Sequence, residues 1–175
     1  MRQDVIIRNM IAEDIDAVAQ IYEEVLEPSY ISYSELGEGK AKALGELSEN
    51  AVAIFRGQLQ SLLNSTRHAF FVASINRSVV GFACASLHEA QAGHTECWLD
   101  DICVSHQWQH QHIGRSLVSK VIEYGIEHNV MHYLLESGVH NASAHHLFES
   151  LGFQPLAIVY WRANNINCIN PRPNS

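Results

Sequence analysis

The sequence predicts a single α/β domain in which a mixed, mostly antiparallel sheet is flanked by helices. The 175 residues suffice for one core, and 47% of them are hydrophobic against 17% charged, which is a globular composition. Apolar residues at helical spacing alternate with short runs rich in β-branched and aromatic residues. No linker or internal repeat divides the chain. We therefore expect one mixed sheet, with the element order βααβββαβαβ.

The first part of the chain is expected to form one strand and two helices. The strand covers 4–10, and the acidic residues after it suit the first turn of a helix that ends before Pro28. The apolar stripe of that helix consists of Ile15, Val18, Tyr22, Val25 and Leu26. The stretch 29–46 contains three glycines and is the least regular part, whereas 47–64 shows helical spacing.

The rest of the chain is expected to build most of the sheet. The predicted strands are 69–75, 79–87, 95–104, 132–139 and 156–161. The first two of these form an antiparallel hairpin around a turn at 76–78. A helix is expected to begin at Ile113, and a shorter one runs from Asn141 to Leu151 and stops at Gly152.

Charge and apolar patterning exclude several classes of partner. Nineteen acidic residues against eleven Lys and Arg give a net charge of −8, which disfavours nucleic acid and favours cationic small molecules. Protonation of the eleven histidines near pH 6.5 would remove much of this charge. The sequence lacks a run of about 18 apolar residues and begins without a signal-peptide pattern, so we expect a cytoplasmic protein without a membrane partner.

The four cysteines are expected to be reduced thiols. Cys84, Cys97, Cys103 and Cys168 show no CxxC pairing, and three of them fall in apolar, strand-like runs. This placement favours neither a disulfide framework nor a structural zinc site.

The stretch QHQHIGRSL, residues 109–117, allows two interpretations. Free N–H groups at a helix start, next to Gly114, would bind a phosphate, and Gln109, Arg115 and Ser116 add side-chain donors. The alternative is a metal site formed by His106, His110 and His112. No acidic or cysteine ligand lies inside this segment, and solvent-facing histidines explain the same residues. We therefore assign no metal ligands here.

Two motifs resemble those of the GNAT superfamily, the acetyl-CoA-dependent N-acetyltransferases. In that family a strand ending in Val leads through a short loop to Arg or Gln-x-x-Gly-x-Gly or Ala at a helix start, which here aligns with ICV (102–104), SHQW and QHQHIG (109–114). The signature Asn-x-x-Ala-x-x-Leu-Tyr-x-x-x-Gly-Phe aligns with NASAHHLFESLGF, residues 141–153. Both motifs lie in the family's order and at its usual separation.

The resemblance implies acetyl-CoA as co-substrate and assigns its binding residues. Residues 109–116 would hold the pyrophosphate, and the backbone of 102–104 would pair with the pantetheine arm. The implied binding residues are Ile102, Cys103, Val104, Gln109, His110, Gln111, His112, Ile113, Gly114, Arg115, Ser116, Asn141, Ala144 and Phe148. Asn141 would cap its helix or bind the pantetheine amides.

Three positions depart from the family pattern. His110 and His112 stand where glycines are common, and Phe148 replaces the tyrosine that often acts as general acid. His112 is tolerable in the loop if it adopts an ordinary φ and its ring points outward. Without the tyrosine, either another phenol serves, with Tyr124, Tyr133 and Tyr160 as candidates, or the thiolate leaves unaided, which its pKa near 8.5 allows.

The catalytic candidates lie on the strand before the phosphate loop. In the family the amine attacks the thioester directly, and a main-chain N–H near a strand bulge polarises the carbonyl. Strict alternation places Trp98, Asp100 and Ile102 on one face of the strand and Leu99, Asp101 and Cys103 on the other. At least one aspartate of a central strand is then buried, and burial raises its pKa toward neutrality.

Asp100 and Asp101 resemble the adjacent Glu-Asp pair of diamine-type acetyltransferases. We expect Asp100 to act as the base, Asp101 to be structural or to orient the amine, and Glu96 to be the reserve base. Alternatively, both aspartates cap backbone donors at a bulge.

The sequence thus predicts an N-acetyltransferase domain over 1–165, followed by a tail over 166–175 that frays. The substrate would be a primary amine, small and cationic, chosen by the stretches 29–46 and 88–94; diamine-like, aminoglycoside-like, amino-acid and protein N-terminal amines remain open. A non-catalytic acyl-CoA-binding module is the alternative, and a metal-binding regulatory protein is a third hypothesis. A homodimer is expected only by analogy with relatives.

Overall fold

The main sheet of the computed structural model has five strands, and the model describes residues 4–162. The strands are β1 (Ile6–Asn9), β4 (His68–Ile75), β5 (Ser78–Glu89), β6 (Thr95–Val104) and β7 (His132–Leu135), in the spatial order β1-β4-β5-β6-β7. Every neighbouring pair is antiparallel except β6 and β7, which run parallel. The predicted fold class, a mixed and mostly antiparallel sheet with flanking helices, is confirmed.

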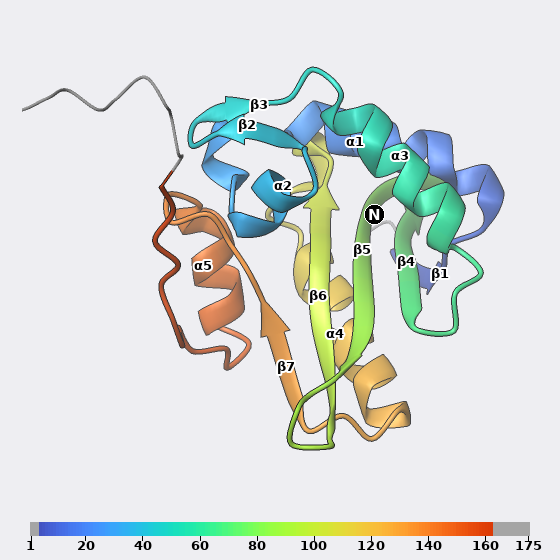
Figure 1. Cartoon of the computed structure of the whole chain (residues 1–175). Coiled ribbons are helices and arrows are strands. Elements are labelled where there is room, and N and C mark those ends of the chain that lie inside the picture. Colours follow the sequence, from blue (N-terminus) through green and yellow to red (C-terminus); the bar gives the residue numbers. More distant parts are fainter. Residues whose placement is uncertain (1–3, 163–175) are drawn as a thin grey trace, which may run out of the picture.

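Helices cover both faces of this sheet (Figure 1). On one face α1 (Ile15–Val25), preceded by the short turn η1 (Ala12–Asp14), packs with α3 (Ala51–Leu62) on Phe82 and its neighbours. On the other face α4 (Ile113–Glu127) packs on a second core. The last helix, α5 (Ala142–Glu149), joins that second core through the buried Phe148. Alternate residues of β4 and β5 supply the two cores, as the period of two in a strand requires.

The stretch predicted to be irregular is more ordered than expected. It contains η2 (Pro28–Tyr30), α2 (Tyr33–Gly37) and a small sheet of β2 (Ala41–Ala43) and β3 (Glu46–Leu47). The side chain of Ser32 accepts from the Ser34 N–H, and Glu35 accepts from the Ser32 N–H, which together form a capping box. These elements lie next to the end of β6 (Figure 1).

Two boundary predictions are corrected by the packing. The second helix begins at Ala51 instead of 47, because 46–47 pair in the small sheet. The strand expected over 132–139 ends at Leu135, and Gly138 then packs so tightly that an added Cβ would lie 2.2 Å from the carbonyl oxygen of Ser29. The chain is therefore diverted away from β6 at this point.

The strand predicted over 156–161 does not form. These residues have no regular structure, and their large apolar side chains are exposed, with Tyr160 91% accessible. A strand requires a partner for its backbone groups, and this segment runs beside α5 (Figure 1). Composition alone therefore predicted the wrong state.

Two further points concern the ends of the chain and its helices. The predicted domain boundary at 165, the tail 166–175 and Cys168 lie outside the described residues. Within residues 4–162, no helix combines the length and the apolarity that crossing a bilayer requires.

Candidate active site

A bulge interrupts β6 at Asp100. Leu99 pairs with Ala85 and Asp101 pairs with the adjacent Cys84, so Asp100 is an extra residue on β6. The expected strict alternation is therefore wrong. Beyond the bulge the order of faces is reversed, so that Ile102 joins Leu99 in the core under α4.

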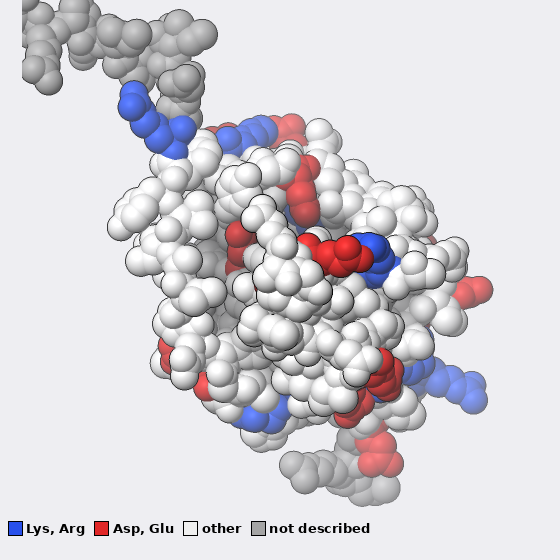
Figure 2. Space-filling view, turned by 60° about the horizontal axis from the view of Figure 1, so that its bottom comes forward, with Lys and Arg blue, Asp and Glu red and all other residues white. Residues whose placement is uncertain are grey.

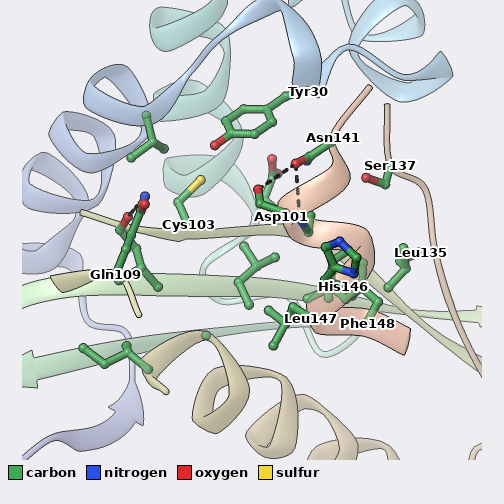
Figure 3. A pocket seen from close by; sticks show the side chains of 18 of the residues that line it. Tyr30, Asp101, Cys103, Gln109, Leu135, Ser137, Asn141, His146, Leu147 and Phe148 are labelled. Carbon is green, nitrogen blue, oxygen red and sulfur yellow. Dashed lines mark hydrogen bonds between the residues drawn. The ribbon is translucent and has the colours of Figure 1, made fainter. Parts of the chain in front are cut away.

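Beyond this bulge, β6 and β7 separate. They pair only from Glu96 and His132 to Leu99 and Leu135. A cavity of about 620 Å³ lies between the separated strands, closed by the start of α4, by α5 and by the segment around η2. All the predicted CoA-binding residues except Gln111 and Ser116 line it, and so do Asp100 and Asp101. The two predicted motifs thus meet at one cavity (Figure 3).

The Asp100 carboxylate lies at the cavity and has one hydrogen-bond donor among the described residues. The Ser86 hydroxyl donates to its Oδ1 at 2.9 Å. Burial raises the pKa of Asp100 to about 6, while the bond from Ser86 acts in the opposite direction. Asp100 keeps contact with solvent through the cavity, and water screens part of this effect. The alternative role for Asp100 was to cap backbone donors at the bulge. Among residues 4–162, no backbone N–H donates to its carboxylate.

The Asp101 carboxylate is more enclosed and lies beside a buried cation. Burial raises the pKa of Asp101 to about 7, although Lys40 Nζ, 3.6 Å from its Oδ2, opposes this. The Lys40 ammonium also contacts Glu38 at 2.8 Å and lies 5.3 Å from the ring centre of Phe55. Burial by itself would lower the pKa of Lys40, but Asp101 and Glu38 raise it, so this ammonium stays charged. Lys40 was not among the predicted site residues, because it lies 61 positions before Asp101 in a stretch without a motif.

A chain of hydrogen bonds leads from Asp100 to the surface. The Ser86 hydroxyl, which contacts Asp100, also lies 2.9 Å from Nε2 of His88. Ser86 is buried and His88 is exposed. A proton on Asp100 therefore has a route through one hydroxyl to an imidazole in contact with water.

The loop before α4 carries strain at two histidines. His110 has φ +60° and His112, the residue before the helix, has φ +63°. The condition under which His112 would fit the loop without strain, an ordinary φ, is therefore not met. The loop geometry requires the left-handed conformation at both positions, which explains why relatives often carry glycine there.

The start of α4 presents its first N–H groups toward the cavity. Ile113, Gly114 and Arg115 line it, and helix geometry leaves their N–H groups without acceptors inside the helix. Arg115 also donates to the Ser150 hydroxyl at 2.8 Å. The donors predicted at Gln109 and Ser116 are engaged elsewhere, since they bond the carbonyl oxygens of Val104 and His112.

The Asn141 side chain caps α5, which is one of the two roles predicted for it. Its Oδ1 accepts from the Ala144 N–H at 3.4 Å. Phe148 is buried in the core and also lines the cavity. Of the three tyrosines named as replacement acids, none lines the cavity: Tyr133 donates to the Ile122 carbonyl, Tyr124 packs in the core under α4, and Tyr160 is exposed.

Two other tyrosines, which the sequence did not single out, line the cavity. Tyr22 comes from α1, and the Tyr30 hydroxyl faces the sulfur of Cys103 in Figure 3. Burial raises the pKa of Tyr30 to about 12, so this phenol is neutral at physiological pH. No helical or strand pattern distinguishes Tyr30, which lies in the short turn η2.

Two acidic residues line the cavity near α2. Glu136, just beyond β7, accepts from the hydroxyl and the backbone N–H of Ser34 at 2.7 and 3.2 Å. Glu35 lies on the same helix and lines the cavity with Glu136. Beside them, the hydroxyl of Ser137 is buried and has no partner among the described residues. An unpaired buried hydroxyl at a cavity indicates a place for a ligand.

The reserve base lies away from the cavity, and the three histidines of the metal hypothesis line the cavity without forming a cluster. Glu96 does not line the cavity; its Oε1 lies 3.3 Å from Nε2 of His94. The His106 ring bonds the carbonyl oxygen of Glu24, and within residues 4–162 its ligand atoms form no cluster with those of His110 and His112.

Charge is distributed unevenly around the cavity. Its lining includes five acidic residues, Glu27, Glu35, Asp100, Asp101 and Glu136, whereas its one Lys or Arg is Arg115 at the start of α4. On the face that Figure 2 shows, basic side chains are scattered and do not gather into a patch. The cavity therefore has a negative end at β6 and β7 and a positive end at α4.

Comparison with known proteins identifies relatives of the whole fold. The sequence model described as the acetyltransferase (GNAT) family matches residues 21–153. N-acetylaspartate synthetase of Homo sapiens is 32% identical over 85 residues, which are 49% of this chain and 27% of that protein. The match thus spans about a quarter of that relative.

Two solved structures superpose over most of both chains. One is described as a transcriptional regulator from Bacillus halodurans C-125, with TM-score 0.69, 17% identity and coverage of 91% of this chain and 99% of that chain. The other is the aminoglycoside N-acetyltransferase AAC(6')-Iy in complex with CoA, with TM-score 0.69, 15% identity and coverage of 94% and 98%. At these identities the structures support the fold alone.

Proposed function

Because the chain belongs to the GNAT acetyltransferase family, we propose that it transfers the acetyl group of acetyl-CoA to the amino group of a small cationic molecule. The observation that carries this proposal is the cavity itself. Two carboxylates with raised pKa values stand at one end of it, and the unpaired N–H groups of a helix start stand at the other. An acid–base site and an anion site thus open into the same space.

The residues at the positive end suit acetyl-CoA. The N–H groups of Ile113, Gly114 and Arg115 would hold the pyrophosphate. The edge of β6 at 102–104 has no strand partner on the β7 side, so its backbone groups can pair with the pantetheine amides. The Ser137 hydroxyl, which is buried and has no partner within residues 4–162, offers one further bond. When bound, acetyl-CoA supplies the thioester whose acyl group is transferred.

Asp100 would act as the base in this reaction. Its carboxylate takes a proton from the ammonium or the attacking amine and can release it through the Ser86 hydroxyl to His88. Asp101, paired with Lys40, holds the bulge and attracts the cationic substrate. A backbone N–H at the bulge would stabilise the oxyanion. Tyr30 is a neutral phenol at the cavity that can donate to the leaving sulfur.

Charge at the other end of the cavity selects the substrate. Five carboxylates line the cavity, so a molecule with several positive charges is favoured. The aminoglycosides named for one structural relative have this character. The aspartate named for the human relative does not, since its carboxylates would face Glu35 and Glu136. We therefore propose a polyamine-like or aminoglycoside-like amine.

A thiol-release assay with acetyl-CoA across an amine panel tests the proposal. The panel includes spermidine, an aminoglycoside, aspartate and a peptide N-terminus, and we expect turnover with the polycations. Asp100→Asn should lower kcat/KM by about 10²- to 10⁴-fold. Asp16→Asn, which alters an exposed carboxylate paired with Arg56, is the matched control and should leave turnover unchanged.

The pH profile provides a second readout. The base must be deprotonated, so kcat/KM should fall as pH drops through about 6, the pKa of Asp100, and level off above about 7. Unchanged turnover in Asp100→Asn would remove Asp100 as base. Binding of acetyl-CoA without thiol release for any amine would favour the alternative, a non-catalytic acyl-CoA-binding module.

A further inference from the structure

A second group of titratable side chains lies at the opposite end of β6 from the bulge. His94 immediately precedes β6, Glu96 is its second residue, and His132 is the first residue of β7. Glu96 and His132 are register partners across the parallel pair. The proposed acetyl transfer uses none of these three residues, and none of them lines the cavity.

The potential ligand atoms of these side chains converge. Nε2 of His94 and Nδ1 of His132 lie 3.3 and 3.8 Å from Glu96 Oε1, and all three atoms lie within 4.8 Å of one another. Ligands bound at about 2.0–2.2 Å in a tetrahedral zinc site are about 3.3–3.5 Å apart. Small side-chain rotations would therefore bring these atoms to the separation that such a site requires.

The surroundings leave room for a further ligand. The side chains of His94 and Glu96 are 21% exposed and that of His132 is 56% exposed, so water reaches the group from one side. The two imidazole rings are 5.0 Å apart and nearly perpendicular. His88, on β5, is the register partner of Glu96, but its Nε2 is engaged with Ser86.

We propose that His94, Glu96 and His132 bind a divalent transition-metal ion of the zinc type, with water as the fourth ligand. Two imidazoles and one carboxylate suit zinc, nickel or copper, whereas magnesium and calcium require mostly oxygen ligands. This site differs from the sequence-based metal hypothesis, which rested on His106, His110 and His112. Glu96 lies on β6 and His132 on β7, 36 positions apart in the sequence, and His94 immediately precedes β6.

The position of the site indicates what the metal does. The two strands pair over only four register positions before they separate around the cavity. An ion held by Glu96 on one strand and His132 on the other cross-links them where they are still paired. The expected effect is therefore on stability, because the ion binds the folded chain and not the unfolded one.

Calorimetric titration of the full-length, chelator-treated protein with ZnCl₂ tests this site. We expect one zinc ion per chain and a rise of several degrees in Tm with zinc but not with magnesium. His94→Ala combined with His132→Ala should abolish both effects. His128→Ala combined with His140→Ala removes two exposed histidines outside the group and should preserve them, which separates this site from weak binding by other surface histidines.

Cobalt provides a check that does not depend on stability. Co²⁺ bound by the wild-type protein should show the strong visible absorption of a tetrahedral complex, and Glu96→Gln should weaken it. The proposal is overturned if the wild-type protein binds no zinc, if the His94/His132 variant binds it with unchanged affinity, or if the control variant loses binding equally. Activity plays no part in these readouts, so failure of the acetyl-transfer proposal would not affect them.

Discussion

The two halves of β6 are built for different tasks. From Glu96 to Leu99 the strand is paired on both sides, with β5 and with β7. From Asp100 to Val104 it keeps only β5 as a partner, begins with a bulge and borders the cavity. Both halves carry carboxylates, but Glu96 faces two imidazoles whereas Asp101 faces a buried ammonium.

This difference shows how the loss of one neighbouring strand creates a site. Where β7 leaves, backbone groups become free, space opens and the carboxylates of Asp100 and Asp101 border the cavity. Enclosure raises the pKa values of Asp100 and Asp101 to about 6 and 7. In the proposed reaction, the half with a single partner carries the base, and the fully paired half takes no part. Changes in the second half should therefore alter activity and its pH dependence, while leaving the rest of the sheet intact.

The largest effect is expected from removing the buried cation behind the second half. Lys40→Met leaves Asp101 and Glu38 without their ammonium partner and should destabilise the fold by about 3 kcal/mol, since a buried charge loses its partner. Lys40 also lowers the pKa values of Asp100 and Asp101. Without it, both carboxyls hold their protons to higher pH, so the acid limb of kcat/KM should move upward. Thermal unfolding and the pH profile measure these two effects.

Lys42→Met is the matched control for this change. Lys42 is half exposed and pairs with the exposed Glu49, so its loss should cost little stability and leave the pH profile in place. If both variants gave the same pH profile, Lys40 would not control the protonation of the site.

The contrast between Lys40 and α4 shows what a sequence can reveal. The loop before α4 and the helix α5 lie where the motifs at 102–114 and 141–153 predicted, because each is a local pattern with its own turn and cap. Lys40, Tyr30 and Glu136 reach the cavity through tertiary packing, which no local spacing records. The residue at which the bulge lies was also not predicted, because one inserted residue leaves the composition of a strand unchanged. The prediction of a strand over 156–161 was wrong for a related reason, because a strand-like composition does not guarantee a neighbouring strand with which to pair.

An intermediate effect is expected from His88, which lies on β5 opposite the paired half. His88→Gln removes the imidazole at the surface end of the chain through Ser86 and should lower kcat by about tenfold or less, because water can replace it in part. Added imidazole buffer should restore part of the rate, which a purely structural role would not allow.

His68→Gln is the control for this variant. His68 lies on β4, the other neighbour of β5, and is the register partner of Ser86 there. Its ring bonds the hydroxyl of Ser65 and not that of Ser86. We expect its kcat and its response to imidazole to match those of the wild type. Equal losses of kcat in the two variants would indicate a general effect of histidines on this face and would contradict a proton route through Ser86 and His88.

The smallest effect concerns the loop that follows the second half of β6. His112→Gly relieves a left-handed conformation that costs a side-chain-bearing residue about 1–2 kcal/mol, but glycine also gains about 0.5–1 kcal/mol of entropy in the unfolded chain. The net gain should be about 0.5–1 kcal/mol, seen as a higher Tm, with a KM for acetyl-CoA that is unchanged or a few-fold lower. Gln107→Gly, in the short turn η3 (His106–Trp108) with a right-handed backbone, should lose stability instead. A gain of stability in His112→Gly and a loss in Gln107→Gly, five residues away, would show that the loop requires its left-handed geometry and not its histidine. A loss of stability in both variants would mean that the imidazole of His112 contributes more than its strain removes.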